Sequence, residues 1–328
     1  MKRIAVAGAG GFIGGWLVQE LLKSGCNEIV AGDIKPLEEW HQFSHRATNM
    51  QLDLSDIQSC RRFLEGVDEV YNLAADMGGM GFIELNKAAC MLSVLINTHM
   101  LQAAKERGVA KFFFASSACV YRADLQESSR VTALREQDAY PASPEDGYGW
   151  EKLFSERMCR HFTEDFGVQT RVARFHNVYG PLGTYEGGRE KAPAAICRKV
   201  AQALISGIHE IEIWGDGEQT RSFTYISDAI FGVKQLMSST FCEPVNIGSS
   251  ELVSINQLVS MVESIAGVKL VRKYNLSAPL GVRGRNSDNS LVKKVLNWEP
   301  SMSLFNGLSE TYTWVLKELT DGRQLLKG

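Results

Sequence analysis

Residues 4–14 read IAVAGAGGFIG, and this stretch decides the fold. A short apolar run ends at Ala7, and glycines follow at positions 8, 11 and 14. Glycines so placed permit a tight turn, the close approach of a pyrophosphate and close packing of a helix on the strand. The apolar spacing from Trp16 to Lys23 predicts that helix, whose positive amino-terminal end would face the phosphates. The residues expected to line a dinucleotide are Gly8, Gly11, Phe12, Ile13 and Gly14.

The next predicted strands end in residues suited to the rest of such a cofactor. A strand over residues 28–32 is followed by Asp33. A carboxylate about 20 residues beyond the glycines accepts hydrogen bonds from the adenosine ribose and disfavours a 2′-phosphate, which predicts NAD. The third strand ends near Asp53 and Leu54, which we expect beside the adenine. Ala74 closes the fourth strand, and its small side chain lets the backbone pass close to the cofactor.

The alternation of strand and helix patterns through about residue 180 predicts an α/β fold with a doubly wound parallel sheet. At 328 residues the chain can form two lobes. We expect an NAD-binding domain over residues 1–180, to which segments near 219–248 return, and a smaller substrate-binding lobe from residues 181–218 and 249–328. Within these parts, the patterns predict one long helix from about Phe82 to Arg107. They also predict two short strands around a turn, at residues 211–214 and 221–225.

Composition narrows the classes of function. A formal net charge of −3 supplies no general attraction for nucleic acid or an anionic membrane. No apolar run is long enough to span a bilayer, and the first residues open directly into a strand, so we expect no membrane segment and no signal peptide. Seven cysteines without a Cys-x-x-Cys pair predict free thiols, a reducing compartment such as the cytoplasm, and no metal site.

A hydroxyl, a phenol and an ammonium form the candidate catalytic set. Ser117 follows the apolar run 112–114, and Tyr148 and Lys152 have a spacing that puts both on one helix face, one turn apart. A cation there can lower the pKa of the phenol, so that the phenol exchanges a proton near neutral pH. Hydride transfer to or from a secondary alcohol beside a nicotinamide needs these groups. Cys119, two residues past Ser117, is expected to face the same pocket.

Five further stretches carry a family resemblance. They are NLAADMGGMGFI at 72–83, SSAC at 116–119, RFHNVYGP at 174–181, GREKAPAA at 188–195 and GVRGRNSDN at 281–289. RFHNVYGP, the glycine turn and the Ser117/Tyr148/Lys152 set resemble the extended short-chain dehydrogenase/reductases, a Rossmann-type superfamily of nucleotide-sugar enzymes. Within that superfamily the other four stretches resemble the GDP-mannose 3,5-epimerase family. The likeness runs from about residue 3 to about residue 318. One departure is Arg122, where the family pattern has proline.

This resemblance implies an isomerase that uses NAD without net redox change. Tyr148, supported by Lys152 and Ser117, would take the proton of the C4 hydroxyl of GDP-mannose as a hydride moves to NAD⁺. The resulting 4-keto group acidifies the C–H bonds at C3 and C5. Cys119 and Lys191 resemble the family's acid–base pair, the thiolate removing a proton and the ammonium delivering one. Return of the hydride to C4 would give GDP-L-galactose and GDP-L-gulose.

The same resemblance implies a set of substrate contacts and a homodimer. The substrate contacts are Gly78, Ser117, Cys119, Asn177, Glu190, Lys191, Ala192, Lys199, Gln219, Arg221 and Arg283. The other cysteines are interpreted as packing residues, because cysteine is among the most buried residue types: Cys26, Cys60, Cys90, Cys159, Cys197 and Cys242. We expect His161 and His176 to be structural, and Trp214 and Trp298 to lie in the core of the smaller lobe.

Three alternatives remain open from the sequence. A 4-epimerase of the superfamily would need no acid–base pair beyond Tyr148. A 4,6-dehydratase usually carries an Asp-Glu pair where this chain has Ala118 and Cys119. A nucleotide-sensing regulator could keep the fold without catalysis, although Tyr148, Lys152 and the Cys119/Lys191 pair are all present here.

Overall fold

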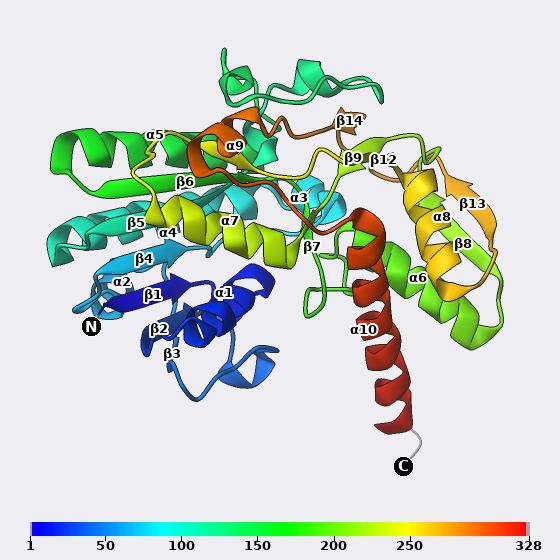
Figure 1. Ribbon diagram of the computed structural model, residues 1–328, viewed down its shortest axis with the longest axis horizontal. Helices are drawn as coiled ribbons and strands as arrows, with labels where there is room; N and C mark the ends of the chain where they lie inside the picture. Colours follow the sequence, from blue (N-terminus) through cyan, green and yellow to red (C-terminus); the bar gives the residue numbers. More distant parts are fainter. Residues whose placement is uncertain (1, 326–328) are drawn as a thin grey trace.

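The computed structural model describes residues 2–325, and a seven-stranded sheet organises it (Figure 1). The strand order is β11-β6-β5-β4-β1-β2-β3, and every neighbouring pair is parallel. The strands are β1 (Arg3–Ala7), β2 (Glu28–Asp33), β3 (Thr48–Gln51), β4 (Glu69–Asn72), β5 (Lys111–Ser117), β6 (Gln169–Phe175) and β11 (Val245–Ile247). This arrangement confirms the predicted doubly wound parallel sheet.

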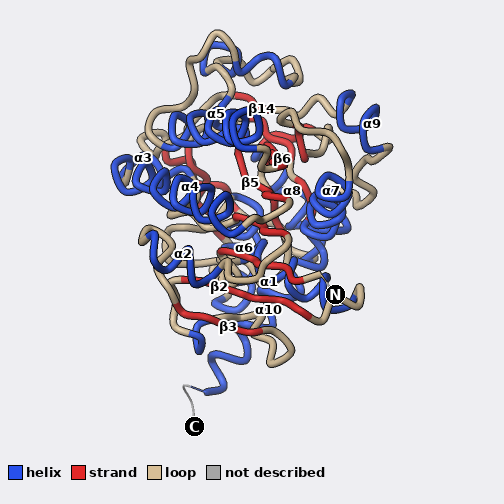
Figure 2. The backbone as a smooth tube through the Cα atoms, turned by 90° about the vertical axis from the view of Figure 1, so that its left-hand side faces the viewer, coloured by secondary structure: helices blue, strands red, loops and turns tan. Residues whose placement is uncertain are grey.

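Helices cover both faces of the sheet because consecutive residues of its inner strands are apolar, so that apolar side chains point to both faces. On β1, Ile4 and Val6 join the core beneath α1, whereas Ala5 and Ala7 join the core beneath α4. One face carries α1 (Phe12–Lys23) and α7 (Ile226–Ser238), which pack together. The other carries α2 (Ile57–Phe63), α4 (Lys87–Arg107) and α5 (Tyr148–Phe166), so that the sheet lies between two helical layers (Figure 2).

The other strands form three small sheets at one end of the seven-stranded sheet. They are β7 (Val178–Tyr179), β8 (Glu210–Trp214), β9 (Thr220–Ser222), β10 (Thr224–Tyr225), β12 (Leu252–Ser254), β13 (Val271–Asn275) and β14 (Gly284–Arg285). There the helices α6 (Ala192–Ser206), α8 (Ile255–Ala266) and α10 (Leu304–Leu325) pack on one another, whereas α9 (Ser290–Leu296) packs on β11 and α7. Because α7 and β11 belong to the main sheet and its cover, residues 226–247 return to it. The division into two domains stays a prediction.

The short strands predicted at 211–214 and 221–225 are present as β8, β9 and β10, whereas the long helix predicted from Phe82 is divided. Strands β8 and β9 do not pair with each other: β8 pairs with β13, and β9 lies between β12 and β14. The predicted single helix from Phe82 is two helices, α3 (Met80–Leu85) and α4, separated by Asn86. The side chain of Asn86 donates to the Phe82 carbonyl oxygen at 2.9 Å, which satisfies the end of α3. Short 3₁₀ turns span Leu37–Glu39, Ala118–Val120, Ala123–Gln126 and Glu136–Ala139.

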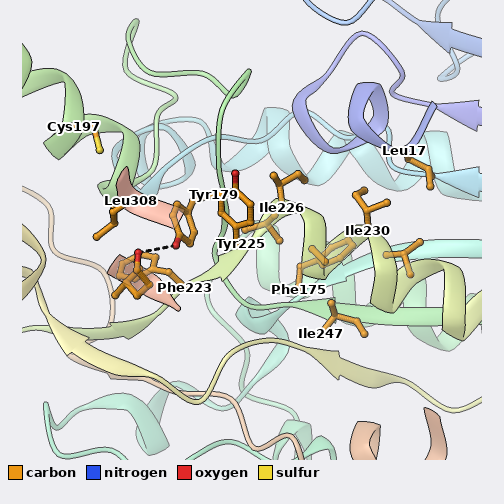
Figure 3. Close-up of a cluster of buried hydrophobic side chains, with 14 of the residues drawn as sticks. Leu17, Phe175, Tyr179, Cys197, Phe223, Tyr225, Ile226, Ile230, Ile247 and Leu308 are labelled. Carbon is orange, nitrogen blue, oxygen red and sulfur yellow. Dashed lines mark hydrogen bonds between the residues drawn. The ribbon is translucent and has the colours of Figure 1, made fainter. Parts of the chain in front are cut away.

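A continuous apolar cluster joins the two parts of the molecule. It runs from Leu17 on α1, through Phe175 and Ile226, to Cys197 on α6 and Leu308 on α10 (Figure 3). The Tyr179 hydroxyl donates to the Leu304 carbonyl oxygen at 3.2 Å within this cluster. Burial of this apolar cluster fixes the smaller lobe against the carboxyl ends of the sheet strands.

Two predictions about buried residues need correction. Trp298 is 5% exposed, but it packs against Gly232 of α7 on the main sheet, whereas Trp214 is 42% exposed. Cys242 is exposed as well, and its sulfur accepts from Arg171 Nη1 at 3.3 Å. Across residues 2–325, none of the helices is both apolar and long enough to cross a bilayer. The cytoplasmic location stays a prediction.

Candidate active site

The glycine turn after β1 has the geometry that a dinucleotide requires. Gly8 has a φ of +80°, and its amide donates to the Gly32 carbonyl oxygen at 2.8 Å. A Cβ on Gly14 would meet the Gly8 carbonyl oxygen at 2.1 Å, so only glycine allows α1 to begin this close to the strand. The Asp33 carboxylate lies at the same turn, where it accepts from the Gly10 amide at 3.0 Å. Turn, helix start and carboxylate together fit NAD.

The other predicted cofactor residues lie at the same edge of the sheet. The Asp33 carbonyl oxygen accepts from the Leu52 amide at 2.9 Å, which brings Asp53 and buried Leu54 to the end of β2. A Cβ on Gly8 would stand 2.9 Å from the Ala74 amide nitrogen, so the end of β4 touches the glycine turn. Parallel sheets bind ligands at this edge, where the carboxyl ends of the strands meet.

The candidate catalytic set meets where β5 ends and α5 begins. Ser117 is the last residue of β5, and Tyr148 and Lys152 are one turn apart on α5, 5% and 2% exposed. The Lys152 ammonium lies 3.4 Å from Glu151 Oε2, 4.8 Å from the ring centroid of Phe114 and 5.4 Å from that of Tyr148.

The pKa of Tyr148 is raised well above its ordinary value, mainly because the phenol is buried. Charges on Cys119 and Glu151 raise the pKa of Tyr148 further, while a hydrogen bond with Ser117 lowers it. This direction is opposite to the one expected from the Tyr-x-x-x-Lys spacing alone. The physical reason is that burial of the phenol, with the charges of Cys119 and Glu151, outweighs the effect of the Lys152 cation.

Cys119 lies in the 3₁₀ turn that follows β5, and three cationic side chains surround it. Its amide donates to Ser117 Oγ at 3.2 Å, and its side chain is buried. Arg285 Nη1 lies 3.6 Å from its sulfur. Burial lowers the pKa values of Lys191 and Arg221, that of Arg221 to about 10. Charge on the Cys119 thiol opposes this shift in both groups, so both are near enough to interact with it.

Lys191 stands at the start of α6, as the sequence predicts. It is the amino-terminal cap residue of that helix and is half-buried. Burial lowers the pKa of the Lys191 ammonium, and the positive end of α6 is also an unfavourable place for a cation. Within residues 2–325, its ammonium has no ion-pair partner shorter than 4.0 Å. A lysine held this way gives up a proton more readily than a lysine in water.

The glycine-methionine loop packs directly on the segment that carries Lys191. The Gly79 amide donates to the Arg189 carbonyl oxygen at 3.0 Å, and a Cβ on Gly79 would stand 2.4 Å from the Glu190 carbonyl oxygen. Arg189 also pairs with Asp76 at 2.6 Å and lies 3.7 Å from the ring centroid of Phe82. Gly78, Glu190 and Lys191, which are distant in sequence, therefore come together.

The remaining predicted substrate residues lie on α6, on β9 and directly before it, and in the loop after β6. Ala192 is the first residue of α6, and on the same helix Lys199 donates to the Glu212 carbonyl oxygen at 2.8 Å. Asn177, with a φ of 42°, donates to the Ser222 carbonyl oxygen at 3.0 Å. Gln219 donates to the Trp214 carbonyl oxygen at 2.9 Å, while its own Oε1 is buried and has no hydrogen-bond partner within the described range 2–325.

Arg285, rather than Arg283, is the arginine of the 281–289 stretch that reaches Cys119. Arg283 pairs with Asp216 at 2.8 Å near the surface, whereas Arg285 is 4% exposed. Arg285 donates from Nε to Gln126 Oε1 at 2.6 Å and contacts the carboxylate of Glu145. The motif marked this stretch, but two arginines two residues apart could not be distinguished without the pairing of β14 with β9.

Comparisons with known proteins agree with this geometry. The family model for the NAD dependent epimerase/dehydratase family matches residues 4–248. The chain is 46% identical to GDP-mannose 3,5-epimerase 1 of Oryza sativa subsp. japonica, over 97% of this chain and 82% of the relative. It is 45% identical to GDP-mannose 3,5-epimerase of Arabidopsis thaliana, over 97% and 83%.

Solved structures show the same fold. The UDP-glucose 4-epimerase of Thermotoga maritima superposes with a TM-score of 0.87 at 25% identity, over 97% of this chain and 99% of that one. The UDP-glucuronic acid 4-epimerase of Bacillus cereus, solved with UDP-glucuronic acid and NAD, superposes with a TM-score of 0.82 at 28% identity, over the same shares.

Proposed function

Because the chain belongs to the NAD-dependent epimerase/dehydratase family and is an NAD-dependent nucleotide-sugar epimerase, we propose that it inverts C5 and C3 of GDP-mannose. The observation that carries this proposal is that Cys119 packs in one buried cluster with Tyr148 and that Lys191 is near enough to interact with the charge of Cys119. The relatives named GDP-mannose 3,5-epimerases, which align with almost the whole chain, support the same substrate. The products are then GDP-L-galactose and GDP-L-gulose.

The chemistry that NAD supplies when bound is the reversible acceptance of a hydride. Tyr148 takes the proton of the C4 hydroxyl, and the Ser117 hydroxyl holds the phenol in place for this transfer. The sugar is then a 4-ketone, whose C3 and C5 protons are acidic because each carbanion is stabilised as an enolate. When the ketone is reduced again, Tyr148 returns its proton to the C4 oxygen.

Inversion of a carbon by proton exchange needs a base on one face and an acid on the other. Cys119 is the base: its sulfur lies 3.6 Å from Arg285 Nη1 and near enough to Lys191 and Arg221 to interact with their charges. Lys191 is the acid, because burial weakens its hold on its proton. A 4-epimerase has no use for such a pair, and a 4,6-dehydratase would carry Asp-Glu at residues 118–119. The intact set also disfavours a regulator without catalysis.

The test is to incubate the protein with GDP-mannose in deuterated water and to analyse the sugars released. Wild type should form the galactose and gulose epimers with deuterium at the inverted carbons. Cys119→Ala should lower epimer formation and deuterium uptake by a factor on the order of 100 to 10,000, the usual contribution of a positioned acid or base. It should still oxidise C4, so that bound NADH accumulates.

Two results would point elsewhere. A Cys119→Ala variant that keeps more than about a tenth of wild-type epimerisation is incompatible with a general base at this position. Production of a 4-epimer alone would move the function to a 4-epimerase. Tyr148→Phe is the matched control, because without the 4-ketone neither C3 nor C5 exchanges its proton, and all turnover should stop.

We also propose that the enzyme is a homodimer, with α4 and α5 as the contact. These neighbouring helices expose large apolar side chains that a monomer would leave in water: Met91, Leu92, Leu95, Trp150 and Phe154. Contiguous exposed apolar patches of this kind mark protein interfaces. A second copy related by a twofold axis would bury the same patch on both chains.

A further inference from the structure

A buried carboxylate beside the catalytic lysine has no role in the mechanism above. Glu151 is 3% exposed and follows Tyr148 by three residues on α5. Its Oε1 accepts from Ser155 Oγ at 3.0 Å. Its Oε2 is buried, has no hydrogen-bond partner among residues 2–325, and lies 3.4 Å from the Lys152 ammonium. Burying a carboxylate oxygen without a hydrogen bond is costly, so its presence calls for an explanation.

The surroundings show which groups this carboxylate influences. From α5 it faces Tyr148, Lys152 and Ser155, and from α4 it faces Cys90. The Lys152 ammonium lies over the Phe114 ring, which offers no counter-charge of its own. Glu151 is thus the anion nearest to the cation that the reaction uses.

We propose that Glu151 is a positioning residue that holds the Lys152 ammonium beside Tyr148 and offsets its charge, and so sets how firmly the phenol holds its proton. This inference rests on the proposed function, since a redox-neutral epimerase must use Tyr148 in both directions within each turnover. The phenol first takes the C4 proton and later returns it. The lysine cation alone would lower the pKa of the Tyr148 phenol, and the phenolate would then be a weaker base. A carboxylate beside the lysine offsets this effect, so that the phenol can both accept and return the proton.

The direct test is titration of the Tyr148 phenol in the purified protein without substrate. Tyrosine labelled with ¹³C at Cζ gives an NMR signal that shifts on ionisation, and Tyr148→Phe identifies the signal. Glu151→Gln keeps the shape of the side chain but removes the charge, so the titration midpoint should move to lower pH by about one unit. Ser155→Ala is the matched control: it removes a hydrogen bond from Glu151 but leaves the charge, so the midpoint should stay. An unchanged or higher midpoint in Glu151→Gln overturns the proposal.

A second variant covers the case in which Glu151→Gln does not fold. That change leaves the buried Lys152 cation without its partner, which is strongly destabilising. Glu151→Gln combined with Lys152→Met removes both charges, so no unpaired ion is buried. If the two charges offset each other at Tyr148, the double variant should titrate within about half a unit of wild type. A midpoint a full unit or more higher than wild type would mean that Glu151 offsets nothing.

Turnover separates a failure of this inference from a failure of the proposed function. With GDP-mannose, Glu151→Gln should move the acid limb of the pH profile for C4 oxidation to lower pH by the same amount as the NMR midpoint. If wild type does not turn over GDP-mannose, the substrate assignment fails, while the NMR titration still decides the role of Glu151. If wild type turns over and the midpoint does not move, only the inference about Glu151 is lost.

Discussion

Replacing Gly79 with alanine should separate the two halves of the proposed reaction. A Cβ at this position would stand 2.4 Å from the Glu190 carbonyl oxygen, whereas ordinary contact begins at 3.4 Å. The difference, 3.4 − 2.4 = 1.0 Å, must be taken up by backbone, because the contacted atom is not part of a flexible side chain. Gly79 has a φ of −69°, which alanine adopts freely, so backbone strain adds nothing. The expected effect of Gly79→Ala is therefore a displacement of the backbone at Glu190.

The displaced segment carries Lys191, the residue next to Glu190. A misplacement of about 1 Å can cost on the order of 100-fold in the rate of a positioned reaction. We therefore expect Gly79→Ala to lower deuterium incorporation at C5 and C3 about 100-fold at saturating GDP-mannose. Tyr148 and Lys152 lie on α5 rather than on this segment, so formation of bound NADH in a single turnover should stay near wild type.

Gly81 provides the matched control in the same loop. A Cβ there would lie 3.4 Å from the Trp214 ring, an ordinary contact, and the residue is inside α3, where alanine favours the helix by up to about 1 kcal/mol. Gly81→Ala should therefore keep both half-reactions. The reasoning is refuted if Gly79→Ala epimerises as fast as Gly81→Ala, or if NADH formation falls in parallel with deuterium uptake.

Three further outcomes follow from the structure. Phe154→Glu, on the exposed face of α5, should convert a dimer to a monomer in size-exclusion chromatography with light scattering, whereas Ile208→Glu, at a residue at least as exposed between α6 and β8, should not. Burial lowers the pKa of His176 from 6.5 to about 4, so its contribution to stability is present above pH 6.5 and is lost as pH falls toward 4. The free energy of unfolding in urea should fall by about 3 kcal/mol over that range, and His176→Gln should flatten this part of the curve. Nucleotide extracted from wild type should be NAD(H), and Asp33→Ser should raise the share of NADP(H), because the carboxylate at the end of β2 no longer repels a 2′-phosphate.

The local backbone structure of this protein can be predicted from its sequence. The glycines at 8 and 14 specify the turn before α1, because the Gly8 φ of +80° and the 2.1 Å approach at Gly14 admit no side chain. The strand predicted over residues 28–32 is β2, and the helix predicted from Trp16 to Lys23 is the greater part of α1. Helical and strand periodicity depends on neighbours a few residues apart, so a sequence pattern is sufficient for it.

The partners of each element were decided only by the tertiary structure. The runs that became β8 and β9 are close in sequence, yet β8 pairs with residues 271–275 and β9 with residues 252–254 and 284–285. The pairing of each strand depends on which distant strand lies beside it in the fold, and no local sequence pattern predicts that. The same folding step brought Arg285 rather than Arg283 to Cys119.

The electrostatics of the site were likewise set by burial. The Tyr148/Lys152 spacing placed both groups on one helix face, as predicted, but it predicted a lowered pKa for the phenol. The structure raises the pKa of Tyr148, because the cost of desolvating a phenolate and the nearby charges of Cys119 and Glu151 exceed the effect of the lysine. Spacing determines which groups can meet, whereas the strength of a charge depends on the water and the ions that the rest of the fold leaves around it.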